Sequence, residues 1–387
     1  MKKIAYPVLL IVLALGLIIT ACSQPAPAPT ASPSPAPSPT AKPSPTATPT
    51  PTATAAPKPA AIKEWISATA SETTYGYTVG ATLARVANKE LEKQGIPVRM
   101  KNVTGPGSTV NFRSYDKGET DMFYMNTPAQ LQAWTNTGPF EKDLLKHKSY
   151  QGVYFFSSDL FALIRSDSKD KIKSFADFAG KKVFPQPMGS AGYEAVKSAF
   201  EALGIWNKID PRPITFEQFG SSLKTGAVDA GIATAIAAGR SSPPWLPEMI
   251  LTTDVNVVNP TDAEKKAIAG VKGLTPTIFP AERLFGKKNV GVTDVWCFSI
   301  YQGWNFPAYG TTDEVYAFVK AWYEHTDDLV AIDPGFKQFA EDGLKFNAMI
   351  LDSLSEVPIH PGVAKYYKEK GIWKSSWKEG QVLPKDW

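Results

Sequence analysis

The chain has 387 residues, of which 43% are hydrophobic and 20% are charged, and its formal net charge at pH 7 is +4. So small a charge excess, without a Lys/Arg-rich block, argues against a nucleic-acid partner. Two cysteines are too few for a disulfide framework, so a domain of this size must be held together by its hydrophobic core. We therefore expect a globular protein whose partner is a small molecule or another protein.

The first 22 residues have the order of an export signal. Two lysines after Met1 precede an apolar run from Ile4, which leads to Ile19-Thr20-Ala21-Cys22. A positive start, an apolar middle and small residues before the cut describe a secretory signal, and the last four residues resemble a bacterial lipobox. We predict that residues 1–21 are removed and that acylated Cys22 anchors the protein to the cell membrane on its extracytoplasmic side. A signal anchor is the alternative, because the run is about long enough to span a bilayer.

The next segment, residues 22–60, consists almost wholly of Pro, Ala, Thr and Ser after the cysteine. Such a composition cannot fill a core. We expect a disordered linker that is biased to polyproline II, with a reach of at most roughly 100 Å at about 3.1 Å per residue. An O-glycosylated, mucin-like stalk has the same composition and remains an alternative.

The rest of the chain, from about Ile62, is longer than one core usually supports, which predicts two lobes. Strand and helix patterns alternate, which favours an α/β fold. Cys297 lies in a strand-like apolar run and is expected to be a buried, unreactive thiol. Strands are expected at 65–68, 97–100, 121–125, 159–165, 182–184, 228–232 and 296–301. Helices are expected at about 79–94, 108–117, 190–203 and 315–323.

Two of the expected helices open with a similar glycine-serine pattern, GPGSTVN at 105–111 and PMGSAGY at 187–193. Free backbone N–H groups and the helix dipole make such a start a ready anion site. A serine at the N-cap also satisfies an orphan N–H, so a purely structural role is the alternative for either loop. Neither loop is a nucleotide fingerprint, since Val110 occupies the third glycine position of the first.

Several short motifs keep a fixed order along the chain. They are YGYTVG at 75–80, TGPGSTVN at 104–111, GETDM at 118–122, SFADFAGKKV at 174–183, GSAG at 189–192 and GAVDA at 226–230. In this order they resemble the TAXI family, the extracytoplasmic solute receptors of TRAP transporters, over about Ile62 to Ala331. The resemblance implies a type II periplasmic-binding-protein fold, in which two α/β lobes close on a solute. It also implies a TRAP membrane permease as partner, and no cofactor.

On this resemblance we place lobe 1 at residues 61–162 and 293–387, and lobe 2 at residues 163–292. Tyr75 and Tyr77 would form an aromatic wall, and Arg113 would be a carboxylate clamp unless it points to solvent. Residues 126–128 (NTP) end a strand and start a helix, which suggests a further N-cap at the cleft edge. The complete set of expected ligand-binding residues is Tyr75, Tyr77, Ser108, Asn111, Arg113, Asn126, Thr127, Ser190, Tyr193 and Thr234.

The chain departs from the family pattern at 72–74 (ETT), 189–192 (GSAG) and 234–237 (TAIA), which predicts an altered pocket. A small organic anion or an amino-acid-like solute is expected, with an aromatic acid as the alternative. A binding protein of an ABC importer is the alternative to a TRAP receptor. An exported enzyme has less support, because the three histidines lack metal-type spacing and there is no Gly-x-Ser-x-Gly motif.

Overall fold

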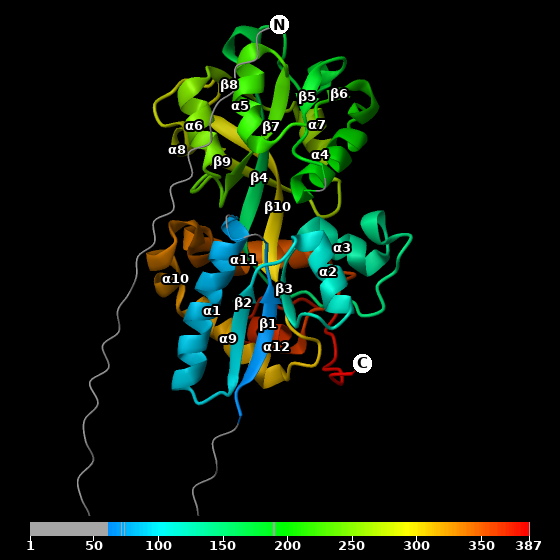
Figure 1. Ribbon diagram of the computed structural model, residues 1–387, viewed down its shortest axis with the longest axis vertical. Coiled ribbons are helices and arrows are strands. Elements are labelled where there is room, and N and C mark those ends of the chain that lie inside the picture. Colours follow the sequence, from blue (N-terminus) through cyan, green and yellow to red (C-terminus); the bar gives the residue numbers. More distant parts are fainter. Residues whose placement is uncertain (1–60, 71, 73, 189, 387) are drawn as a thin grey trace, which may run out of the picture. The chain divides into compact units, whose positions relative to one another are not determined.

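The computed structural model describes residues 61–70, 72, 74–188 and 190–386 (Figure 1). The predicted signal peptide, the lipidation site at Cys22 and the linker lie outside the described residues, as does the side chain of Ser108. Within the described part, no helix combines the length and the apolar character that crossing a bilayer requires.

The described strands form one mixed sheet in the order β2-β1-β3-β10-β4-β7-β5-β6, with β8 paired to β4 and β9 paired to β10. β1 pairs in parallel with β2 and β3, whereas β10 runs antiparallel to β3, β4 and β9. The bounds are β1 Lys63–Ala68, β2 Val98–Val103, β3 Met122–Asn126, β4 Val153–Arg165, β5 Lys182–Phe184, β6 Asp210–Pro211, β7 Ala230–Ile236, β8 Val255–Val258, β9 Thr275–Pro280 and β10 Asp294–Trp304.

Helices flank both halves of this sheet. We call lobe 1 the part that contains β1–β3 with α1–α3 and α9–α12, and lobe 2 the part that contains β5–β9 with α4–α8. The lobe 1 helices are α1 Tyr75–Lys93, α2 Ser108–Asp116, α3 Thr127–Thr135, α9 Thr312–Glu324, α10 Thr326–Ile332, α11 Lys337–Ser353 and α12 Pro361–Glu369. The lobe 2 helices are α4 Ala191–Ala202, α5 Phe216–Thr225, α6 Trp245–Thr252, α7 Asp262–Ala269 and α8 Glu282–Phe285.

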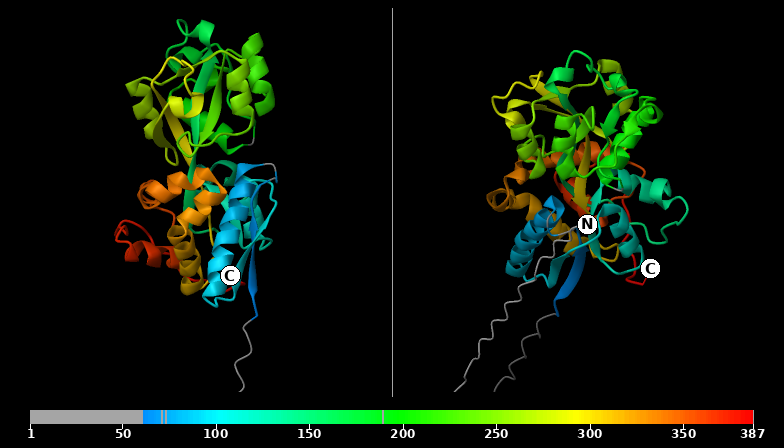
Figure 2. Two further views of the ribbon diagram at one scale, coloured as in Figure 1. Left: turned by 90° about the vertical axis from the view of Figure 1, so that its left-hand side faces the viewer. Right: turned by 45° about the horizontal axis from the view of Figure 1, so that its top comes forward.

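The long strands β4 and β10 run from one lobe into the other (Figures 1 and 2). Along β4 the side chains alternate between two cores of lobe 2, because successive residues of a strand face opposite sides. Leu160 and Ile164 pack into one core, while Phe161 and Leu163 pack into the other. Lobe 1 has its own core, which includes Trp65, Leu83, Trp304 and Trp322. The expected two-lobed α/β architecture is thereby confirmed; the lobe boundaries at 162/163 and 292/293 stay a prediction.

The two largest differences between the observed and the expected start of an element are at α1 and β4. α1 starts at Tyr75 instead of Val79, because Thr74 caps it by accepting a hydrogen bond from the backbone N–H of Tyr77. β4 starts at Val153 instead of Asp159, because this strand is buried on both faces and so lacks the alternation that marks a half-exposed strand. Cys297 lies buried in β10 as expected, and burial raises the pKa of its thiol.

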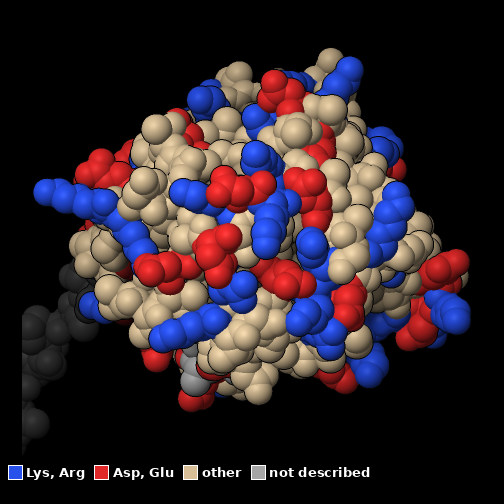
Figure 3. Space-filling model, turned by 90° about the horizontal axis from the view of Figure 1, so that it is seen from above, with Lys and Arg blue, Asp and Glu red and all other residues tan. Residues whose placement is uncertain are grey.

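Acidic and basic side chains intermingle on the face of lobe 2 seen in Figure 3. Lobe 2 also contains close ion pairs, such as that of Arg165 with Asp167. Mixed charges cancel over short distances, so this face does not present the single-sign field that nucleic-acid binding requires.

Candidate functional site

A cavity of about 950 Å³ lies between the lobes and is lined by both of them and by the crossing strands. Its size falls in the range of small-molecule sites. Lobe 1 contributes Thr74, Tyr75, Gly107, Thr109, Val110 and Tyr124 among others. The crossing strands contribute Phe156, Ser158, Leu160, Ile300 and Gln302. Lobe 2 contributes Gln186, Ser190, Glu217, Thr234, Trp245 and Glu248 among others.

The start of α2 brings main-chain groups to the lobe 1 wall. Its N-cap is Gly107, which has a φ of 107° and offers no side-chain hydrogen bond to the helix. Asn111 instead fixes the helix to the neighbouring strands from its buried side. Its fully buried amide donates to the carbonyls of Ala68 (3.3 Å), Thr69 (2.7 Å) and Tyr124 (3.3 Å). The first turn of α2 therefore reaches the cavity without a side-chain cap of its own.

The start of α4 forms part of the opposite wall in a different manner. Ser190 is the N-cap, and its hydroxyl accepts from the backbone N–H of Tyr193 at 3.1 Å. Gln186, just before it, has a φ of 78° and donates its amide to the carbonyl of Ile232 (2.6 Å) and to the hydroxyl of Thr234 (3.1 Å). A left-handed backbone conformation costs free energy in a residue other than glycine. The two side-chain hydrogen bonds of Gln186 hold it in this conformation.

Aromatic rings line both sides of the cavity. On the lobe 1 side, Tyr75 packs edge-on against Phe156, with 5.0 Å between the ring centroids. Burial raises the pKa of Tyr75, so its hydroxyl stays protonated at neutral pH. On the lobe 2 side, Phe216 and Trp245 stack at 5.2 Å with an interplanar angle of 14°. Such walls suit a solute with a flat apolar part.

The charged side chains of the wall are all acidic. Among the described residues that line the cavity, Glu217 and Glu248 carry charge, and none is Lys, Arg or His. Glu217 lies in the first turn of α5 and Glu248 in the first turn of α6, and both side chains are exposed. Hydrogen bonds from its own backbone N–H and from Thr215 lower the pKa of Glu217, which keeps this carboxylate ionised.

The crossing region contains a buried carboxylate. Asp159 of β4 accepts hydrogen bonds from Ser299 Oγ (2.8 Å) and from the backbone N–H of Ala238 (2.7 Å), and burial raises its pKa to about 6. The turn that it contacts is left-handed at three successive residues, 237–239, with φ values of 55°, 56° and 72°. The next residue, Arg240, pairs with Glu341 of α11, so this turn also ties lobe 2 to lobe 1.

Three of the residues expected from the sequence line the cavity, namely Tyr75, Ser190 and Thr234. The side chain of Ser108 lies outside the described part, although its neighbours Gly107 and Thr109 are in the wall. Whether any of these residues contacts a solute stays a prediction.

The other expected residues have different partners and are not in the wall. Asn111 is bound to backbone carbonyls, and Tyr77 lies on α1, where its own carbonyl accepts from Asn102. Arg113, the expected carboxylate clamp, instead pairs with Asp143 at 3.1 Å and lies over the ring of Phe140. Its guanidinium is therefore engaged on the outer side of α2.

The remaining three residues act within the fold. Asn126 caps α3, as the sequence suggested, by accepting from the N–H of Ala129 at 3.0 Å. Thr127 donates to the carbonyl of Gly273 at 2.8 Å, which links the two lobes. Tyr193 packs edge-on against Trp206 within lobe 2.

The sequence analysis missed several residues of the wall. Gln302 lies in a largely apolar, buried strand, and this was a usable signal, because a polar residue in a buried strand needs a partner. Trp245 and Glu248 follow a Pro-Pro pair that starts a helix, which was not among the expected elements. No local pattern marked Gln186 or Tyr124.

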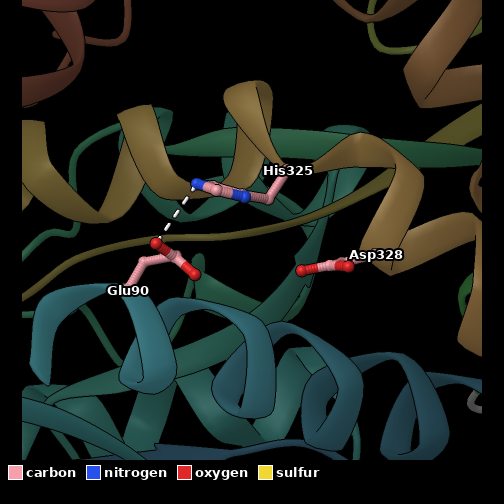
Figure 4. A group of neighbouring side chains, drawn as sticks. All are labelled: Glu90, His325 and Asp328. Carbon is pink, nitrogen blue, oxygen red and sulfur yellow. Dashed lines mark ion pairs between the residues drawn. The ribbon is translucent and has the colours of Figure 1, made fainter. Parts of the chain in front are cut away.

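A group of three side chains with metal-ligating chemistry lies elsewhere in lobe 1, among the described residues (Figure 4). Ligand atoms of Glu90, His325 and Asp328 all lie within 4.8 Å of one another, and His325 Nε2 is 3.4 Å from Glu90. Lysines already partner both carboxylates, with Lys93 Nζ 2.7 Å from Glu90 and Lys89 Nζ 3.4 Å from Asp328. These positive charges make the group an ion-pair network between α1 and α10.

Comparisons with known proteins give a family and a set of distant structures. The model of the NMT1-like family matches residues 67–371. The periplasmic aliphatic sulphonate binding protein SsuA from Escherichia coli has 14% identity and a TM-score of 0.41, with 81% of this chain and 94% of that chain covered. A putative sulfonate-binding protein from Methylobacillus flagellatus KT has 14% identity and a TM-score of 0.48, with 83% and 98% covered.

A third structure, a putative L-cystine ABC transporter from Listeria monocytogenes, has 16% identity and a TM-score of 0.38, with 73% of this chain and 98% of that chain covered. At such low identities and TM-scores, these similarities do not indicate which solute this chain binds.

Proposed function

This chain belongs to the NMT1-like family, and we propose that it is a solute receptor that binds a small molecule between its lobes and delivers it to a membrane permease. The observation that carries the proposal is the cavity of about 950 Å³, whose wall comes from both lobes and from the strands that join them. Cavities at lobe junctions are the usual sites for small ligands. We expect binding without turnover.

Lobe closure on the solute is the mechanism we propose. β4 and β10 are the crossing strands, and the left-handed turn at 237–239 beside Asp159 is the natural place for backbone angles to change. The order of the family motifs favours a carboxylate-bearing solute, and the uncapped start of α2 at Gly107 supports a place for an anionic group.

The receptor would be held at the extracytoplasmic surface by lipid on Cys22, with residues 22–60 as a tether. The signal-like order of the first 22 residues supports this location. Replacing Cys22 with Ala should abolish acylation and release the protein from membranes. A variant that still partitions into detergent and still carries an acyl mass would contradict the anchor.

The type of the partner permease is the most specific part of the proposal. The TAXI-like motif order supports a TRAP permease, whereas a binding protein of an ABC importer remains the second candidate. Cross-linking on intact membranes, followed by mass spectrometry, separates the two. A large integral permease without an ATPase favours the TRAP type, and a permease in complex with an ATPase favours the ABC type.

Calorimetry and X-ray scattering test the receptor itself. The small molecules that co-purify with the protein are identified by mass spectrometry and added back to protein stripped by unfolding and refolding. We expect one-to-one binding and a smaller radius of gyration in the bound state. Turnover of the added molecule, or binding outside the cavity, would contradict the proposal.

A further inference from the structure

We infer that the solute of this cavity carries a cationic nitrogen group, such as an amine, amidine or guanidine, next to a flat apolar part, and has a net charge of zero or above. This inference rests on the proposed function and names the chemical class of its solute. It admits a carboxylate at the start of α2 only as part of a zwitterion, and it excludes dicarboxylates.

The charges of the wall are the first observation. Glu217 and Glu248 line the cavity, and neither forms an ion pair with any described residue. Their position in first helical turns is favourable by itself, because the helix dipole attracts negative charge there. A solute with net negative charge would nevertheless meet two carboxylates without a cationic side chain from the described wall to offset them.

The buried amide of Gln302 at the wall is the second and independent observation. Gln302 is 4% exposed, and its Oε1 has no hydrogen-bond partner among the described residues, while its Nε2 donates to Ser158 Oγ at 3.1 Å. Gln186, also in the wall, uses its amide hydrogens on Ile232 and Thr234. A buried acceptor without a donor is costly, and an N–H group of the solute that reaches Gln302 Oε1 would satisfy it, whereas a carboxylate would not.

The aromatic rings complete the match. Trp245 and Glu248 are three residues apart on α6 and so lie on one face of this helix. Phe216, which stacks on Trp245, is adjacent to Glu217 in sequence. A cationic nitrogen is attracted by both carboxylates and ring faces, so this corner of lobe 2 offers two favourable interactions to the same group.

Calorimetry with probes that share one ring system but differ in charge tests the inference. Tryptamine, tryptophan and indole-3-propionate share one flat ring system but are a cation, a zwitterion and an anion; glutarate adds a dianion. A wider thermal-shift screen of organic solutes is sorted into the same charge classes. We expect binders among the cations and zwitterions. Binders confined to the anions would overturn the inference but leave the receptor function standing, and the absence of binders in every class would overturn both.

Variants of the two glutamates locate the cationic group. Glu217→Gln and Glu248→Gln should each lower the affinity for the best cationic or zwitterionic probe about two- to fivefold, the range for exposed ion pairs. Glu282→Gln, an exposed first-turn glutamate of α8 outside the cavity, is the matched control and should bind as the wild type does. A Glu217→Gln/Glu248→Gln double variant with wild-type affinity would overturn the assignment.

Discussion

The starts of α2 and α4 look alike in sequence and differ in structure. α4 is closed by its own serine, since Ser190 accepts from the backbone N–H of Tyr193. α2 begins after Gly107, which has no side chain to accept, and it is fixed by Asn111 from the side away from the solvent. Similar sequences thus give two different helix starts: in α4 the serine satisfies the N–H of Tyr193, whereas α2 has no side-chain acceptor at its N-cap.

The largest effect is expected from Asn111, because it anchors α2 to two strands of lobe 1. Asn111→Ala removes the donor to the carbonyls of Thr69 and Tyr124 and leaves buried acceptors without a partner. We expect a loss of about 3 kcal/mol in the free energy of unfolding, measured by urea denaturation. Asn207→Ala, at an exposed position, should change this free energy by less than about 0.5 kcal/mol. Equal stabilities of the two variants would show that Asn111 does not hold α2.

The second effect concerns the backbone at Gly107. Its φ of 107° is a conformation that side chains rarely adopt, although a Cβ there would meet no atom within 4 Å. Gly107→Ala should therefore cost about 1 to 3 kcal/mol through backbone strain alone, and it should also weaken solute binding, because the start of α2 would shift.

Gly95→Ala is the control for this substitution. Gly95 follows α1, has a φ of 68° and also meets no atom within 4 Å. Its substitution should cost about 1 kcal/mol without a change in affinity. If Gly107→Ala kept wild-type affinity, the start of α2 would have no part in the site.

The sequence predicts local structure better than it predicts the cavity wall. The strands at 65–68 and 182–184, the helix after Ser190 and the cap at Asn126 follow from patterns that lie within a few residues of one another. The long strand β4 was only half recognised, because burial on both faces removes the alternation of a strand.

The wall itself joins residues that are remote in sequence. Tyr124, Gln302 and Trp245 come together only because β10 lies between β3 and β4 and because both lobes border the same cavity. Asn111 and Ser190 were equally plausible contacts in sequence, since both belong to a segment in which a Gly-Ser pair opens a helix. Which of them meets a backbone carbonyl and which meets the cavity depends on the strand underneath, and no local pattern encodes that.

The smallest effect is expected at Ser190, the N-cap of α4. It tests whether this hydroxyl serves only to cap the helix. Ser190→Ala should cost about 1 kcal/mol of stability, because the N-cap acceptor for Tyr193 is lost, whereas Ser190→Gly should cost only a few tenths. If the hydroxyl serves mainly as a cap, both variants keep the affinity of the wild type within about twofold, since α4 itself remains in place. Chemical denaturation and calorimetry on the same samples separate the two roles. A drop of about tenfold or more in affinity for both variants would show that the hydroxyl contacts the solute, and then the two helix starts would act alike across the cavity.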